Sequence, residues 1–305
     1  MSKKLVNFLK WLWVAVVLVG AVWYFYSHFQ EISGYLSTLS ISRILLSIFL
    51  LFIGKFLLSD ITRLSLKKVD WVIPYSEALS ITSITQLGKY LPGGIWHFAG
   101  KFGVYKVKGV TTKQTTQAMV YENIWLLSSA TVVGLLMLLG SSGDAVCGYA
   151  KFLCDDRLRI AIIAGLPVVL VIGLYLFERL FFPGSKAHIP DFLLVLVEQV
   201  SIWVLFGISY WLVFPSQSGF LMPIIGAFSL SWVAGYVAFF APGGIGIREF
   251  LLTVILGGLF ASQEVALYAT VHRLIWVLVE IILGTISATL IGLPATEEIS
   301  SADHY

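Results

Sequence analysis

Six apolar segments, each about long enough to cross a lipid bilayer, place the strongest constraint on how this chain folds. A membrane-spanning helix needs about 20 mostly apolar residues, and these segments cover residues 11–27, 43–59, 118–140, 159–177, 192–213 and 267–290. Charged residues make up 12% of the 305, about half the fraction in an average soluble domain. So few charges could not cover the surface of a soluble fold. The sequence therefore predicts an all-α polytopic membrane protein. It excludes an ordinary cytosolic enzyme, a disordered chain and a disulfide-rich secreted module.

Two Pro-Gly-Gly-Ile strings, at residues 92–95 and 242–245, interrupt the remaining apolar sequence. Proline removes a backbone donor and glycine removes the side-chain restraint, so each string is expected to break a helix. Broken backbone at membrane depth is tolerated only where it is buried in protein or lines a cavity. We therefore expect each string to form the tip of a re-entrant hairpin.

The two strings start 150 residues apart, and the same offset aligns the other apolar segments. Residues 11–27 align with 161–177, 43–58 with 193–208, and 118–140 with 268–290. This predicts one membrane domain made of two repeats, residues 1–145 and 146–305, each with three transmembrane helices and one hairpin. An odd number of crossings per repeat makes the repeats inverted, as in many secondary transporters. The alternative is eight full crossings, because residues 220–240 are apolar enough to span.

The basic residues predict the orientation of the chain. With the N-terminus inside, 13 of the 20 Lys and Arg residues fall on the cytoplasmic side, Lys89 and Lys101 among them. Four fall on the outer side and three lie within apolar segments. By the positive-inside rule both termini are expected to be cytoplasmic. Cys147 and Cys154 fall in one outer loop, where they are either free thiols or a disulfide.

The hairpin tips carry the predicted binding chemistry. A short helix is expected to begin at Ile95 and another at Ile245, with unpaired N–H groups and the positive end of the helix dipole facing the bilayer midplane. Such ends suit an anion such as phosphate. The alternative is that the turns only pack the two tips together. The candidate substrate-binding residues are Pro92, Gly93, Gly94, His97, Lys101, Glu122, Pro242, Gly243, Gly244, Arg248, Glu249 and Arg273.

Ionisable residues within the spans add candidates for a cavity lining, since such residues usually face a bundle interior or a wet cavity. At the 150-residue offset Glu122 and Asn123 align with His272 and Arg273, so Glu122 and Arg273 are predicted to line a cavity. Glu249 is expected to neutralise its neighbour Arg248. The other embedded ionisable residues include Lys55, Glu198 and Glu280.

The segments Gly88–Trp96 and Ala241–Glu249 resemble the paired signatures of the lysylphosphatidylglycerol synthase transmembrane-region family, also called the flippase-like domain family. The resemblance runs from about Leu5 to Leu293. It implies an all-helical membrane bundle with re-entrant elements that translocates a lipid. No counterpart of the soluble aminoacyl-transferase domain is expected, so the resemblance indicates a stand-alone member and argues against lysyl transfer.

The expected function is that of a lipid transporter or flippase for an anionic phospholipid or polyprenyl-phosphate lipid. We expect no enzymatic activity, no cofactor, no metal and no nucleic-acid partner, and a location in the cell membrane of a bacterium or archaeon. Two alternatives stay open, namely a membrane-embedded transferase acting on a lipid-linked substrate, and an accessory subunit that partners an enzyme of envelope-lipid synthesis. The acidic residues that a transferase could use, Asp144, Asp155 and Asp156, are interpreted as solvated loop charges.

Overall fold

The computed structural model describes residues 34, 40–91, 94–141, 155–182, 189–214, 219–238 and 241–291. Within these ranges every regular element is a helix, which confirms the all-α class. The predicted first span, Cys147, Cys154 and Asp144 lie outside the described residues. The elements in chain order are α3 (Ile41–Lys67), α4 (Tyr75–Gln86), η1 (Leu87–Tyr90), α5 (Trp96–Val107), α6 (Thr112–Leu139), α8 (Asp156–Phe181), α9 (Ile189–Trp211), α10 (Leu221–Val237), η3 (Pro242–Gly244), α11 (Ile247–Leu256), α12 (Ser262–Ile286) and η4 (Ser287–Ile291).

Five helices are long and apolar enough to cross a membrane, namely α3, α6, α8, α9 and α12 extended through η4. They match five of the six predicted spans, as expected of an integral membrane protein. Each begins earlier than predicted, and at α6, α8 and α12 the added first turn begins with polar residues. At α6 the Thr111 side chain accepts a hydrogen bond from the Gln114 N–H, and the Gln114 side chain accepts one from the Thr111 N–H. This capping box fixes the start of the helix.

Two of the acidic residues that were interpreted as loop charges, Asp155 and Asp156, lie at the start of α8. The Asp155 carboxylate accepts hydrogen bonds from the N–H groups of Arg157 and Leu158. Asp156 forms an ion pair with Arg159 at 2.8 Å, one turn along the helix. Both carboxylates therefore act at the N-terminus of a helix, where negative charge is favourable.

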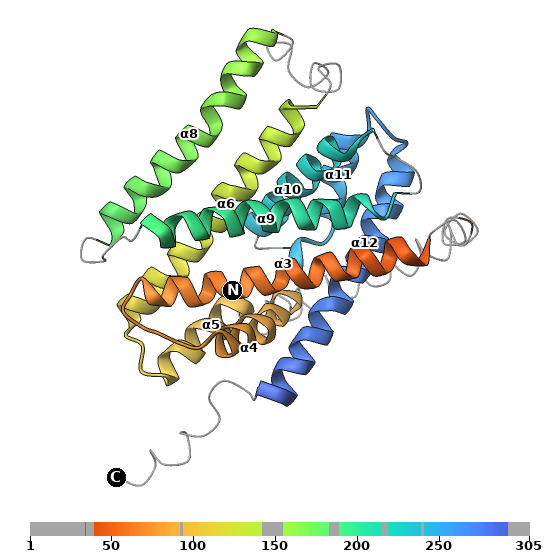
Figure 1. The fold of residues 1–305 in the computed structure, drawn as a ribbon. Coiled ribbons are helices and arrows are strands. Elements are labelled where there is room, and N and C mark those ends of the chain that lie inside the picture. The colour runs from red at the N-terminus through yellow and green to blue at the C-terminus, as the bar shows by residue number, and fades with distance from the viewer. Residues whose placement is uncertain are drawn as a thin grey trace, which may run out of the picture.

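Helices α3 and α9 run antiparallel through the middle of the bundle (Figure 1). Near one end the hydroxyls of Ser47 and Ser209 lie 2.8 Å apart, and near the other Lys67 Nζ lies 2.9 Å from the Asp191 carboxylate. Helix α6 packs against α8 on one side and α10 on the other, while α12 packs against α4 and α11. The short elements α4, α5, α10 and α11 thus lie between long helices.

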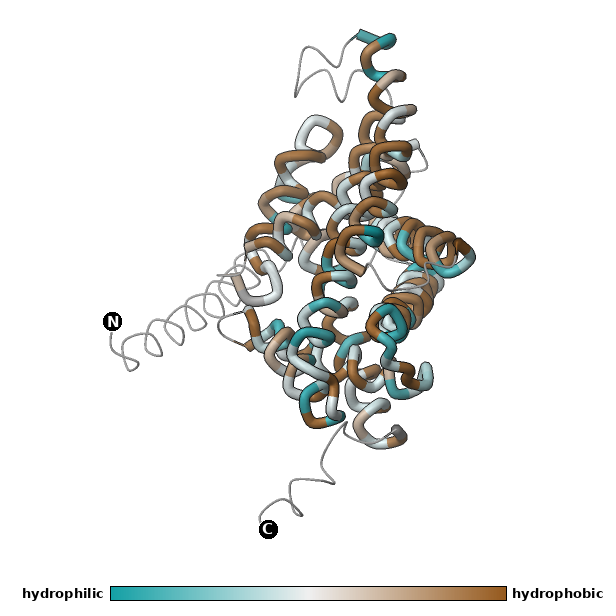
Figure 2. The backbone as a smooth tube through the Cα atoms, turned by 90° about the vertical axis from the view of Figure 1, so that its left-hand side faces the viewer, coloured by the Kyte–Doolittle hydropathy of each residue, from teal (hydrophilic) through white to brown (hydrophobic). Residues whose placement is uncertain are grey.

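Apolar residues dominate the outer helices, and hydrophilic residues gather in the lower part of Figure 2, at the height of α4 and α5 in Figure 1. Large apolar side chains on α8 are strongly exposed, for example Val169 at 69% and Leu180 at 77%. This exposure is expected for a helix that faces lipid chains.

Glycines allow α6 and α10 to approach closely. A Cβ at Gly226 would lie 2.8 Å from the carbonyl oxygen of Gly134, and a Cβ at Gly134 would lie 2.8 Å from the Leu230 side chain. Small residues at such crossings are a common means of packing helices in membranes.

Gly226→Leu is therefore expected to destabilise the fold by about 1–3 kcal/mol, because the added atoms force the two backbones apart. Thermal unfolding of the purified protein in detergent would measure this as a lower apparent melting temperature. Gly165→Leu on α8 is the matched control, since a Cβ there meets no atom within 4 Å. Equal effects of the two substitutions would contradict the prediction.

Candidate functional site

The two helix breaks meet in the middle of the bundle, where η1 contacts η3. A Cβ at Gly243 would lie 3.1 Å from the Tyr90 ring and 2.7 Å from Arg273 Nη2. The Gly243 carbonyl oxygen accepts a hydrogen bond from the Arg273 guanidinium. Gly243 and Gly244 have φ of 59° and 73°, and Gly94 has φ of 64°, a left-handed conformation that glycine adopts readily. Pro92 and Gly93 lie outside the described residues.

Glu280 on α12 is the centre of a buried polar cluster beside this junction and is 2% exposed. Its carboxylate accepts hydrogen bonds from Lys89 Nζ and from the Tyr90 hydroxyl, both at 2.5 Å. It also accepts one from Trp276 Nε1 at 2.8 Å and forms an ion pair with Lys55. One carboxylate thus holds two buried lysines, and it ties α3 and η1 to α12.

Arg248 lies in the first turn of α11 and is 8% exposed. It forms no hydrogen bond or ion pair with any residue that the structure describes, and its Nε is buried without a partner. Its guanidinium carbon lies 5.3 Å from the centroid of the Trp232 ring. Gly235 and Gly244 make room for it, since a Cβ at Gly244 would lie 2.9 Å from Arg248 Nε. A buried guanidinium in this state is costly unless an anion binds it.

Two adjoining cavities share Gln86, His97 and Tyr236 in their walls. The first holds about 500 Å³ of open space between α3, α4, α5 and α6. The second holds about 380 Å³, and its lining includes Lys89, Arg248, Gly94, Gly243 and Gly244. A third cavity, lined by Arg248, Glu249, His272 and Arg273, lies on the α12 side. Arg248 therefore faces two cavities, and Glu122 and Arg273 line cavities as predicted.

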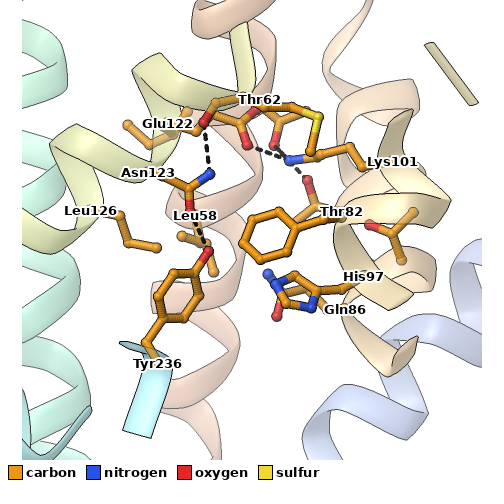
Figure 3. A pocket seen from close by; sticks show the side chains of 14 residues that line it. Leu58, Thr62, Thr82, Gln86, His97, Lys101, Glu122, Asn123, Leu126 and Tyr236 are labelled. Atoms are coloured by element: carbon orange, nitrogen blue, oxygen red, sulfur yellow. Dashed lines mark hydrogen bonds and ion pairs between the residues drawn. The ribbon is translucent and has the colours of Figure 1, made fainter. Parts of the chain in front are cut away.

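Figure 3 shows the first cavity, with Glu122, Lys101 and Thr62 close together at one end and Tyr236 beside Asn123. Lys101 Nζ lies 2.5 Å from the Glu122 carboxylate and donates to the Thr62 hydroxyl at 2.8 Å. The Tyr236 hydroxyl donates to the Asn123 side-chain oxygen. Lys101 and Glu122, both candidate substrate-binding residues, thus pair with each other, and the charge of Lys101 is already matched by a carboxylate.

Lys89 and Lys101, which the count of basic residues places on the cytoplasmic side, are buried ion-pair partners. One further expectation about charges is corrected. Glu249 does not pair with Arg248. Its carboxylate instead accepts a hydrogen bond from the Gly246 N–H at 2.7 Å and caps its own helix.

The expected helix starts are close to the observed ones. Helix α5 begins at Trp96, one residue later than predicted, with Ile95 as its N-cap. Helix α11 begins at Ile247, two residues later than predicted, because Gly246 with φ of 86° delays the helix. The candidate residues near the second break thus come together with Tyr90 of η1 and with Arg273 of α12.

His97 on α5 lies between the first two cavities. Both of its ring nitrogens are buried without a hydrogen-bond partner in the described part of the chain. In its neutral form an imidazole at this place offers one donor and one acceptor to a ligand or to water.

The site residues predicted from the sequence did not include Glu280, Lys55 or Lys89. The signal was present, because Lys55 and Glu280 are charges inside apolar segments. What the sequence did not reveal is that residues 225 positions apart form an ion pair.

Compared with protein-family models and with curated proteins, the chain gives no match. No group of three or more His, Cys, Asp or Glu side chains that could hold a metal ion occurs among the described residues.

Replacing Lys101 by Met is expected to destabilise the protein by about 3 kcal/mol, because it leaves the Glu122 carboxylate buried without its cation. The double variant Lys101→Met/Glu122→Gln removes both charges and should recover most of that loss. Thermal unfolding of the two single variants and the double variant completes a double-mutant cycle. Simple addition of the two single effects would contradict the proposed pairing.

Proposed function

We propose that this chain is a membrane transporter that moves an anionic lipid between the two leaflets, without enzymatic activity. The resemblance of its two glycine-rich breaks to the lysylphosphatidylglycerol synthase transmembrane-region family suggests this activity. The single observation that carries the proposal is the buried guanidinium of Arg248, which faces two cavities and has no anionic partner in the described structure. A lipid headgroup phosphate would supply that partner.

We further propose that the helices form two inverted repeats. The order long helix, short helix, break, short helix, long helix occurs in α3–α6 and again in α9–α12. Gly134 and Gly284, 150 residues apart, both lie at close helix contacts, Gly134 against α10 and Gly284 against Leu87 and α4. The antiparallel pairing of α3 with α9 is what inverted copies of one helix would give.

The short elements support a re-entrant arrangement. Helices α5 and α11 have 12 and 10 residues, which correspond to lengths of about 18 and 15 Å at 1.5 Å per residue. Neither length reaches across a hydrocarbon core of about 30 Å. Helix α10, with 17 residues, also falls slightly short. We therefore favour six full crossings and two hairpins over eight crossings.

In this proposal a lipid headgroup enters the cavities while its acyl or prenyl chains stay in the bilayer. The first cavity is lined by neutral donors and acceptors and by a neutralised ion pair, so it offers a polar route at low electrostatic cost. The second cavity adds the cations Lys89 and Arg248. Rocking of the two repeats against each other would expose the headgroup to one face and then the other.

The test is lipid scrambling in proteoliposomes that contain a fluorescent anionic phospholipid, with a membrane-impermeant quencher to report the outer leaflet. We expect wild-type protein to move the lipid and Arg248→Ala to slow it at least about tenfold, since a charged hydrogen bond is worth about 1.5–3 kcal/mol. Arg179→Ala is the control, because Arg179 is exposed at the end of α8. Unchanged movement in Arg248→Ala would reject the role of this residue.

A further inference from the structure

The charges around the meeting point of the two breaks do not balance. Four cationic side chains and two carboxylates form one group in which each cation lies near other members. Lys55, Lys89, Arg248 and Glu280 are each at least nine-tenths buried. The group among the described residues is Lys55, Lys89, Arg248, Arg273, Glu249 and Glu280. Counted in their ordinary charge states, four cations and two carboxylates leave two positive charges without a counter-charge.

The hydrogen bonds show where the excess charge lies. Glu280 is a single negative charge shared by Lys55 and Lys89, so that pairing leaves one positive charge over. The Glu249 carboxylate is used by the Gly246 N–H. Arg273 donates to a neutral carbonyl oxygen. Arg248 lies over the Trp232 ring and has no hydrogen-bond or ion-pair partner among the described residues. Lys89 and Arg248 both line the second cavity, so the excess charge of the lysine pair and that of Arg248 lie beside the same space.

An excess of two buried charges is expensive in a low-dielectric interior and is expected to be matched by a ligand. A phosphodiester headgroup carries one negative charge, whereas a phosphate monoester carries nearly two above its second pKa of about 6. A terminal phosphate also offers three acceptor oxygens, which suits Lys89, the guanidinium of Arg248 and a neutral His97.

We propose that the site selects a phosphate monoester, which is a dianion, over a phosphodiester. The preference for a dianion does not depend on the proposed lipid translocation. Only the identity of the ligand, a lipid whose headgroup ends in a phosphate, rests on that proposed function. At the 150-residue offset the four cations align with Leu205, Phe239, Phe98 and Asn123, so the site is not duplicated.

The test compares two ligands that differ by one methyl group, dioctanoyl phosphatidic acid and dioctanoyl phosphatidylmethanol. Isothermal titration at pH 8 into purified full-length protein in detergent gives both dissociation constants. We expect phosphatidic acid to bind at least about tenfold more tightly, which corresponds to 1.4 kcal/mol. Arg248→Gln is expected to reduce this preference to less than about threefold, whereas Arg248→Lys, which keeps the charge, retains part of it. Arg179→Gln, which changes an exposed residue outside the site, should behave like wild type.

Equal affinity of the wild-type protein for the two lipids would overturn the inference, as would an undiminished preference in Arg248→Gln whose thermal unfolding shows it to be folded. A third titration uses glycerol 3-phosphate, which has the same terminal phosphate without acyl chains. Weak binding of glycerol 3-phosphate supports a lipid source. Binding as tight as that of phosphatidic acid would overturn the lipid source and the translocation proposal, while the preference for a dianion would stand.

Discussion

Replacing Glu280 by Gln is expected to lower the stability of the protein by about 3–5 kcal/mol, because it leaves Lys55 and Lys89 buried without their shared anion. The amide has the same size as the carboxylate and keeps one acceptor oxygen. The loss of stability therefore measures the removal of the negative charge and not a change in side-chain volume. Tyr90 and Trp276 donate to the same carboxylate and would also lose a charged acceptor. The apparent melting temperature in detergent measures the effect.

The control for Glu280→Gln makes the same chemical change elsewhere on α12. Glu264 lies in the first turn of that helix and is exposed. Glu264→Gln should cost only a few tenths of a kcal/mol, the size of a helix-dipole contribution. If Glu280→Gln melted within about one degree of Glu264→Gln, the buried cluster would not hold the three elements together as argued.

Arg248→Met is expected to make the protein more stable and to abolish lipid movement. Methionine fills much of the space of the arginine stem between Gly235 and Gly244, and it removes a buried charge that has no partner. Replacement of even a buried ion pair by apolar side chains is often neutral or stabilising by about 1–4 kcal/mol, and Arg248 has no ion-pair partner to lose among the described residues. Such a gain at the expense of function is typical of binding residues.

Two measurements check this prediction together. The apparent melting temperature should rise in Arg248→Met, while scrambling of the labelled lipid falls to the rate of protein-free liposomes. An added anionic lipid should raise the melting temperature of wild-type protein but not of the variant, because only the wild type binds it. Arg179→Met changes an exposed arginine and should alter neither property. A less stable Arg248→Met protein would contradict the view that this guanidinium awaits an anion.

Much of the fold could be predicted from the sequence, because the length of an apolar segment directly reflects bilayer thickness. Five predicted spans are observed, and the break at Pro242–Gly244 falls where proline and glycine placed it. Helix ends were less predictable. The start of α6 at Thr112 depends on a side-chain cap, which a hydropathy pattern does not reveal.

The candidate site could be predicted only in part. Arg248 and Arg273 stood out because they are charges beside a helix break or within a span. Lys89 and Lys101 resembled ordinary cytoplasmic lysines, since their burial depends on Glu280 and Glu122 from distant helices. A positive-inside count assigns a lysine to one side of the membrane, and it carries no information on whether tertiary pairing buries that lysine.

The cations Lys55, Lys89, Arg248 and Arg273 are not repeated at the 150-residue offset, and this has a consequence for the kinetics of the proposed lipid transport. A carrier whose two halves were equivalent at the site would have inward-open and outward-open forms of equal energy. Here Arg248 and Arg273 belong to the second half, while Lys55 and Lys89 belong to the first and are held by Glu280 of the second. If the chain is the proposed transporter, its inward-open and outward-open forms would therefore differ in free energy, and we expect one of them to be the resting state. Lipid uptake should then saturate at different lipid concentrations on the two faces of the membrane.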